Sequence, residues 1–297
     1  MARTPRVSLP LVEIGILGGT GLYEIEGLTS VRELRLETPF GLPSDSYFLG
    51  TLEGRRVAFL SRHGRGHRLL PSDINFLANI YGFKMLGAGR IIAVNSCGSL
   101  KEEIRPRDIV FSDQFFDRSR RRNTFFGDGI AVHISFAEPV CPELVDVLYE
   151  AGKGLGLRVH KGGTYISIEG PAFSSRAESK IYRLWGCDVI GMTAATEAKL
   201  CREAEICYAT MNLVTDYDVW HAEEESVSVE LILENLRSNI QHAKSIIKKA
   251  VAVLPRERGE KCHCSRGIEN CIVTQKDLIP PAAQKRLRYL LAKYLNE

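Results

Sequence analysis

Short apolar runs and longer segments of helical spacing follow one another through most of the chain. The apolar runs end in glycine or polar residues, which is the pattern of buried strands that lead into turns. They occupy residues 12–17, 56–61, 90–94, 164–169, 187–192 and 206–214. Strands that alternate with helices predict an α/β fold: a single domain whose central mixed, mainly parallel β-sheet is flanked by helices.

The segments of helical spacing carry start and stop signals. One spans 72–87, and a second begins at Pro142. Ser175 and Glu178 have the spacing of a capping box that opens a third helix. Further helices are expected at about 195–204, at 228–253, which is the longest, and at about 280–295.

The chain reads as one domain with an appendage. No internal repeat occurs, and no linker-like stretch precedes residue 255. We therefore assign residues 1–254 to the main domain. Residues 255–297, a cysteine-bearing loop followed by the last amphipathic helix, are expected to pack on that same domain.

Composition narrows the class of protein. The chain has 297 residues, 44% hydrophobic and 25% charged, and a mean hydropathy of −0.08, all ordinary for a soluble globular protein. A formal net charge of +3 is too small to indicate nucleic-acid binding. The basic run at 118–122 fits a solvated or subunit-interface loop better than a phosphate-backbone contact. No apolar stretch has the length of a membrane span, and no cleavage-type site follows the basic start. These features predict a cytoplasmic protein with no nucleic-acid or membrane partner.

Eight cysteines are many for a reducing compartment; they are Cys97, Cys141, Cys187, Cys201, Cys207, Cys262, Cys264 and Cys271. Three states of these cysteines are possible: zinc ligands, free buried thiols or disulfides. Disulfides are favoured. The Cys-x-Cys spacing at 262–264 is unusual for zinc and no second pair follows it, so no metal is predicted. Only four glutamines and four methionines occur, and 26 arginines stand against 13 lysines. This composition favours a heat-loving source, where intracellular disulfides occur.

Polar residues follow several of the predicted strands. They include the glycine turn at 18–21 with the Thr20 hydroxyl, then Arg62-His63, Asn95-Ser96 and Met192-Thr193. Because ligands bind outside the carboxyl ends of parallel strands, these groups together indicate one crevice, although each alone would be ordinary loop punctuation. The arginine fork suits phosphate oxygens. Arg-His-Gly is also the signature of phosphohistidine-forming phosphatases and mutases, but there it normally follows the first strand.

Asp216 and Asp218 come just after the strand predicted at 206–214. Alternation places both carboxylates on one side of the chain if the extended conformation continues. Two neighbouring carboxylates disfavour joint ionisation, so one of them is expected to keep a proton near neutral pH. Such a pair suits a leaving group that takes up a proton and carries an amine, as adenine does.

A family resemblance runs through residues 12–250. It rests on segments in the order and spacing of the purine nucleoside phosphorylase superfamily, and specifically of its 5′-methylthioadenosine phosphorylase branch: 18–21, 38–45, 62–64, 97–100, 113–118, 137–139, 168–178 and 215–218. The cysteine-bearing tail resembles that of disulfide-bearing archaeal members. If that tail is cross-linked, Cys141–Cys207, Cys262–Cys264 and Cys201 with a tail cysteine are candidate pairs, although spacing cannot fix them.

The resemblance implies a role for each site residue. Phosphate would be bound by Thr20, Arg62, His63, Asn95, Ser96 and Thr193, with Asn95-Ser96 a departure from the mammalian pattern. Met192 would cover the ribose, and Phe173, Ser174, Asp216 and Asp218 would hold the base, with Asp216 at N7 and Asp218 at the amino edge. Thr215, Val229 and Ile232 would contact the methylthio group, together with His133 from a neighbouring subunit of a homotrimer or homohexamer.

The activity that the resemblance implies is phosphorolysis of 5′-methylthioadenosine to adenine and 5-methylthioribose 1-phosphate, and of adenosine as well. The catalytic residues would be Asp216, Asp218 and Ser174. No cofactor is expected, because inorganic phosphate is a co-substrate. The alternative is a broad-specificity purine nucleoside or methylthioinosine phosphorylase.

Overall fold

The computed structural model describes residues 9–19, 21–221 and 229–295. In the helix that begins at residue 229, the side chains at 229–233 and 236 are not described. All statements below refer to this part of the chain.

The centre of the fold is one mixed sheet in which parallel pairs predominate. Its path runs in the order β2-β3-β4-β1-β5-β10-β9-β7, and β11, β6 and β8 extend it from β5. The strands are β1 (Ile14–Gly18), β2 (Thr29–Leu34), β3 (Tyr47–Leu52), β4 (Arg55–Ser61), β5 (Arg90–Ser99), β6 (Ile109–Phe111), β7 (Gln114–Asp117), β8 (Val159–Lys161), β9 (Thr164–Ser167), β10 (Val189–Gly191) and β11 (Cys207–Asp216). The predicted fold class is confirmed.

The sheet branches at β5, where strands from three parts of the chain pair with it. The first half of β5 pairs in parallel with β1 on one side, while β11 pairs with β5 along almost its whole length on the other. Beyond β1, the last two residues of β5 pair instead with β10, which runs antiparallel. The end of β10 therefore points back toward the middle of β5.

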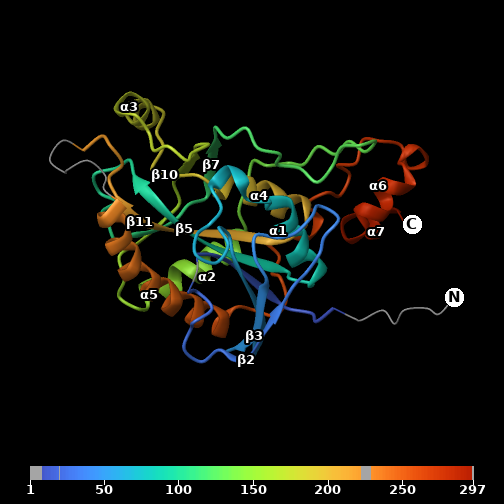
Figure 1. Ribbon diagram of the computed structural model, residues 1–297, viewed down its shortest axis with the longest axis horizontal. Helices are drawn as coiled ribbons and strands as arrows, with labels where there is room; N and C mark the ends of the chain where they lie inside the picture. The colour runs from blue at the N-terminus through green and yellow to red at the C-terminus, as the bar shows by residue number, and fades with distance from the viewer. Residues whose placement is uncertain (1–8, 20, 222–228, 296–297) are drawn as a thin grey trace.

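Helices cover both faces of the sheet (Figure 1). On one face lie α1 (Phe76–Met85) and α4 (Ala194–Glu203), and on the other lie α2 (Pro142–Lys153) and α5 (Val229–Val253). Helix α5 buries Ala243, Ile247 and Val251, while Ile240 on the same face is partly buried. The remaining long helix, α3 (Arg176–Leu184), lies at the end of the molecule opposite the C-terminal helices.

Several predicted boundaries shift, and the structure gives a reason for some. The helix expected at 72–87 begins only at Phe76, because the Asn75 side chain accepts the Ala78 N–H and caps it there; a 3₁₀ turn, η1 (Pro71–Asp73), precedes it. The capping box at Ser175 is present as predicted. The short strands β2, β3, β6, β7 and β8 were not predicted, since several are exposed or only three or four residues long.

Residues from Pro255 to the end contribute to the main core. This segment holds η2 (Cys264–Arg266), η3 (Lys276–Leu278), α6 (Pro281–Arg286) and α7 (Arg288–Leu295). The predicted single helix is therefore two helices that break at Leu287. Ile279, Leu287 and Leu290 are buried in the same apolar cluster as the main domain, and Arg258 donates to the Gly89 and Glu205 carbonyls.

The cysteines differ from the expected pairing. All eight are free thiols, and seven of them are buried. The structure contains no bridge at Cys141–Cys207, at Cys262–Cys264 or between Cys201 and a tail cysteine. Instead, the four sulfurs of the first two pairs approach one another as a group. Among the described residues, no helix combines the length and the apolar character needed to cross a membrane.

Candidate active site

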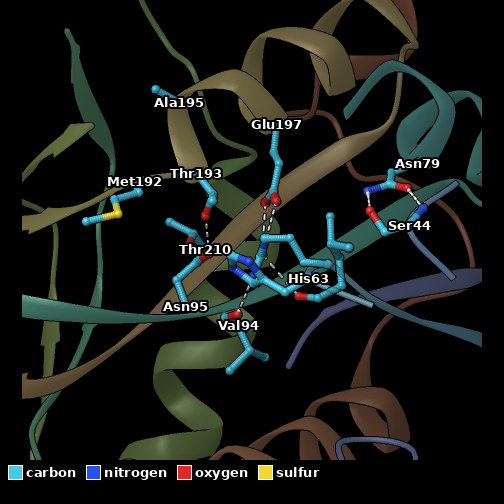
Figure 2. A network of polar contacts seen from close by, with 12 residues as sticks. Ser44, His63, Asn79, Val94, Asn95, Met192, Thr193, Ala195, Glu197 and Thr210 are labelled. Carbon is cyan, nitrogen blue, oxygen red and sulfur yellow. Dashed lines mark hydrogen bonds and ion pairs between the residues drawn. The ribbon is translucent and has the colours of Figure 1, made fainter. Parts of the chain in front are cut away.

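Polar side chains from three parts of the sheet meet where it branches (Figure 2). Arg62 directly follows β4, Asn95 lies within β5, and Thr193 caps α4 just after β10. All three side chains are buried. Three of the residues that the sequence predicted to lie together therefore do so. One of them, Thr193, follows β10, which is antiparallel to β5.

Arg62 is fixed by a buried ion pair with Glu197, from the first turn of α4. Its Nε and Nη2 both donate to the Glu197 carboxylate, the latter at 3.0 Å, while Nη1 donates to the Val94 carbonyl at 2.9 Å. Burial lowers the pKa of Arg62, but the Glu197 charge more than offsets this and the pKa lies above its usual value. The Tyr208 hydroxyl donates to the same carboxylate at 3.0 Å. The Arg62 guanidinium, which the sequence suggested as a phosphate ligand, thus uses most of its N–H groups within the protein, chiefly on Glu197.

Thr193 is oriented by a chain of side-chain hydrogen bonds. Its hydroxyl donates to Asn95 Oδ1 at 2.9 Å, and Asn95 Nδ2 donates to the Thr210 hydroxyl at 2.6 Å. The Thr210 hydroxyl donates onward to Asn212 Oδ1 at 2.9 Å. Asn95 therefore positions Thr193 from within the protein, whereas the neighbouring Ser96 side chain is exposed. This arrangement exists because antiparallel β10 delivers Thr193 to the middle of β5.

His63 is neutral and points one ring nitrogen away from Leu69. Its Nδ1 lies 2.8 Å from the Leu69 carbonyl oxygen, which requires the proton on Nδ1 and leaves Nε2 as an acceptor. Burial lowers the pKa of His63 to about 4. The ring also stacks on His67 at a centroid distance of 4.1 Å. In the free site Nε2 of His63 thus offers a lone pair and not a proton.

Asp216 and Asp218 lie together, but not for the predicted reason. Strand β11 ends at Asp216 and Asp218 has φ = 53°, so the extended alternation does not continue. Instead the chain turns, and the Asp218 N–H donates to Asp216 Oδ1 at 2.8 Å. The Thr215 hydroxyl lies 2.7 Å from the other oxygen, Asp216 Oδ2. A Cβ at Gly98 would stand 2.9 Å from Asp216 Oδ1, so glycine in β5 leaves room for the pair.

The two carboxyls differ in their environment. Oδ2 of Asp218 is buried with no hydrogen-bond partner among the described residues. Burial, assisted by the charge of Asp216 and opposed by the Ser179 hydroxyl, raises the pKa of Asp218 to about 6. Asp218 is thus a carboxyl that still holds a proton at mildly acidic pH, which fits the expectation that one member of the pair does so.

The segment before α3 contributes the remaining base-side candidates. Ser174 is buried and its hydroxyl has no partner among the described side chains, while Phe173 is 54% exposed. The Gly170–Pro171 peptide bond is cis. A Cβ at Gly170 would meet the Met192 sulfur at 2.5 Å, so Met192 packs directly on this turn.

Some predicted site residues are not brought to this cluster. Thr20 lies outside the described residues, and Val229 and Ile232 lie in α5 with side chains that are not described. His133 is exposed, and its N–H donates to the Cys271 carbonyl at 3.0 Å, in the C-terminal segment. No described hydrogen bond or ion pair joins its side chain to the rest of the site.

The basic run at 118–122 is partly internal. The Arg121 side chain, 7% exposed, pairs with Glu169 and donates to the Met192 carbonyl at 2.5 Å. Arg118 donates to the Tyr182 hydroxyl at 2.9 Å. A surface hollow of about 600 Å³ lies beside this run, bordered also by Phe40 and Phe76, and not at the Arg62 cluster.

Sequence reasoning missed Glu197, the residue that holds Arg62. The only available signal was weak: a carboxylate in the first turn of a helix that follows a polar strand end, where acids are common. It also missed Thr210 and Asn212, which read as ordinary strand residues.

The sequence of this chain is similar to a known protein family and to individual members of it. The model of the phosphorylase superfamily matches residues 13–252. The S-methyl-5′-thioadenosine phosphorylase of Koribacter versatilis is 52% identical over 286 residues, covering 96% of this chain and 97% of its own.

Two solved structures are also similar. A methylthioadenosine phosphorylase from an antarctic soil metagenomic library has a TM-score of 0.90 at 44% identity, covering 95% of this chain and 99% of its own. A variant of adenosine/methylthioadenosine phosphorylase from Schistosoma mansoni, in complex with methylthioadenosine, has a TM-score of 0.79 at 34% identity, with 90% and 99% covered. Neither is a phosphohistidine enzyme, the rival that Arg62-His63-Gly64 had suggested. By sequence over nearly its whole length and by fold, this chain belongs to the phosphorylase superfamily.

Proposed function

We propose that this protein catalyses phosphorolysis of 5′-methylthioadenosine, giving adenine and 5-methylthioribose 1-phosphate. Relatives that match 95–97% of this chain carry the name of that activity. The observation that carries the proposal is the carboxylate pair Asp216–Asp218, which stands beside Gly98 of β5, a few residues beyond the Asn95 that holds Thr193. Adenosine is a further substrate of the same site. No organic cofactor takes part in the reaction, since inorganic phosphate is the co-substrate.

The phosphate is proposed to lie against the cluster around Arg62. Arg62 and the N-terminal amides of α4 offer positive charge and N–H donors, and the phosphate lies beside the Thr193 hydroxyl, which is held by Asn95. His63 Nε2 accepts a hydrogen bond from the one protonated oxygen of the phosphate. Thr20 and the Ser96 amide complete the site, while Asn95 acts through Thr193.

The nucleoside is proposed to lie between this phosphate and the acid pair. Met192 covers the ribose, and Phe173 and Ser174 border the base opposite Asp216 and Asp218. The methylthio group lies toward a further set, Thr215, Val229, Ile232 and a neighbouring copy's His133.

The reaction exchanges one bond for another at C1′. A phosphate oxygen forms a bond to C1′ as the bond from C1′ to N9 breaks, and that bonding pair passes to the purine. The sugar carries positive charge in the transition state, which the phosphate dianion stabilises. A proton from the acid pair goes to N7, which makes adenine a better leaving group. We assign Asp216 to the edge of the base that carries N7 and the 6-amino group. Asp218 supplies the proton, and Asp216 passes it to N7.

The proposal extends to the oligomeric state and the cellular location of the protein. An exposed His133 fits a role at the active site of another copy, so we propose a homotrimer or homohexamer. From its composition we also propose that the protein works in the cytoplasm of a heat-loving organism. Disulfides are not part of the proposal, because all eight cysteines are free thiols.

Base release tests the proposed activity. The protein is incubated with methylthioadenosine, adenosine or inosine, each with and without inorganic phosphate, and free base is measured. We expect adenine from the first two only when phosphate is present, and little hypoxanthine. Equal release from inosine would favour the broad-specificity alternative, and release without phosphate would show hydrolysis and refute the proposal.

The pKa of Asp218 makes stability depend on pH. Because the pKa is raised from 3.8 to about 6, the folded state binds the proton more tightly than the unfolded state. This contribution is fully present below about pH 4 and is lost as the pH rises through 6. Asp218→Asn should therefore stabilise the protein by about 3 kcal/mol at pH 8 and by about half of that at pH 5.

Chemical unfolding at several pH values measures this difference. Asp277→Asn, a change at an exposed carboxylate of η3, serves as the control and should show no such trend. A stability difference for Asp218→Asn that is the same at pH 5 and pH 8 would contradict the raised pKa.

A further inference from the structure

Four buried cysteines from distant parts of the chain meet at one point. Cys141 precedes α2, Cys207 begins β11, and Cys262 and Cys264 come from the loop after α5. Their sulfurs all lie within 4.8 Å of one another. The side chains are between 1% and 8% exposed. The cluster therefore joins two elements of the main domain to the C-terminal segment.

The distances fit a metal tetrahedron better than disulfides. Zinc–thiolate bonds of about 2.3 Å in a tetrahedron place the sulfurs about 3.8 Å apart, whereas a disulfide requires about 2.05 Å. Here Cys141 Sγ lies 3.8 Å from Cys262 Sγ, and Cys207 Sγ lies 3.3 Å from it. Cys262 is close to two other sulfurs at once. A disulfide to either one would not explain why the other sulfurs also lie near.

A helix begins at this cluster. Cys141 is the N-cap residue of α2, and a helix N-terminus interacts favourably with negative charge. Four thiolates around one divalent cation leave a net charge of −2, which the helix N-terminus partly offsets.

We propose that Cys141, Cys207, Cys262 and Cys264 bind one structural Zn²⁺ that fastens residues 255–297 to the main domain. On binding, the four thiols release four protons and each sulfur donates a lone pair to the metal, with no change of oxidation state. All four ligands are protein sulfurs, so no position remains for water or substrate.

The site is structural because it lies far from the carboxylate pair. Cys207 and Asp216 are the two ends of β11. Nine strand steps separate them by about 30 Å. Loss of the metal should therefore lower stability while the activity of the folded protein at low temperature is kept.

Metal analysis of untagged protein tests the proposal. The protein is purified with reductant and without added metal, and zinc is measured by mass spectrometry. We expect about one zinc per chain in the parent protein, and less than about a fifth of that in Cys264→Ser. Cys271→Ser changes a cysteine of the same segment that lies outside the cluster, and it should keep the full amount.

A second measurement keeps the test decisive if Cys264→Ser does not fold. The parent protein is denatured and its thiols are titrated with and without a strong chelator. We expect eight thiols together with released zinc, and a Tm lower by about 10 °C or more after chelation. Eight thiols without bound metal would overturn the proposal. Four thiols without metal would indicate two disulfides and would overturn it as well.

Discussion

Asp216→Asn is expected to lower kcat/KM for 5′-methylthioadenosine at least about 100-fold and to shift preference toward 6-oxopurine nucleosides. A carboxylate accepts a hydrogen bond from the 6-amino group of adenine, but it faces lone pairs on a 6-oxo group. The asparagine amide donates instead, so it favours the 6-oxo base and cannot pass a proton toward N7. The substitution is nearly isosteric, and the amide oxygen can still accept the Asp218 N–H that now reaches Asp216 Oδ1.

The ratio of adenosine to inosine turnover is the measurement that checks this. Asp277→Asn removes an exposed carboxylate and should leave the ratio as in the parent protein. An unchanged ratio in Asp216→Asn would remove Asp216 from the base-recognition role. A parallel fall for both nucleosides would mean that proton supply matters but that recognition lies elsewhere.

Glu197→Gln is expected to destabilise the protein by about 3–5 kcal/mol, because it leaves the buried Arg62 charge without its partner. Both side chains are almost fully buried, at 3% and 0% exposure. A loss of this size corresponds to a Tm lower by roughly 10 °C. Phosphate bound beside Arg62 would restore negative charge, so added phosphate should raise the Tm more in the variant than in the parent protein.

Thermal unfolding with and without phosphate checks both parts of this expectation. Asp146→Asn breaks an exposed ion pair with Lys161, 2.6 Å long, and should leave the Tm nearly unchanged. If phosphate stabilises Glu197→Gln no more than the parent protein, Arg62 does not lie at the phosphate site. If the Tm does not fall, the buried pair contributes no net stability.

Local signals were sufficient for much of the fold. The apolar run at 90–94 predicted the strand that became β5, and the Ser175–Glu178 spacing predicted the cap of α3. Both depend on neighbours within a few residues, which a sequence displays directly. The last helix divided at Leu287, and nothing in the structure explains that break.

The candidate site was predictable as a set of residues but not as a geometry. Arg62, Thr193 and Asp216 were identified as strand-end groups, and the structure brings Arg62 and Thr193 to one branch point of the sheet. That Glu197 would occupy the Arg62 fork depends on how α4 packs across the sheet. That Asp218 carries the raised pKa depends on burial after a turn with positive φ.

By itself the sequence determined the fold class, the order of most elements and the residue types available for chemistry, because periodicity and short motifs act locally. Only the tertiary structure decided which groups meet. The two remaining ligands of the four-cysteine cluster lie 55 and 121 positions before Cys262, so the Cys-x-Cys pair alone indicated no metal. Contacts of that separation form only when sheet pairing and helix packing bring distant segments together, and no local pattern encodes them.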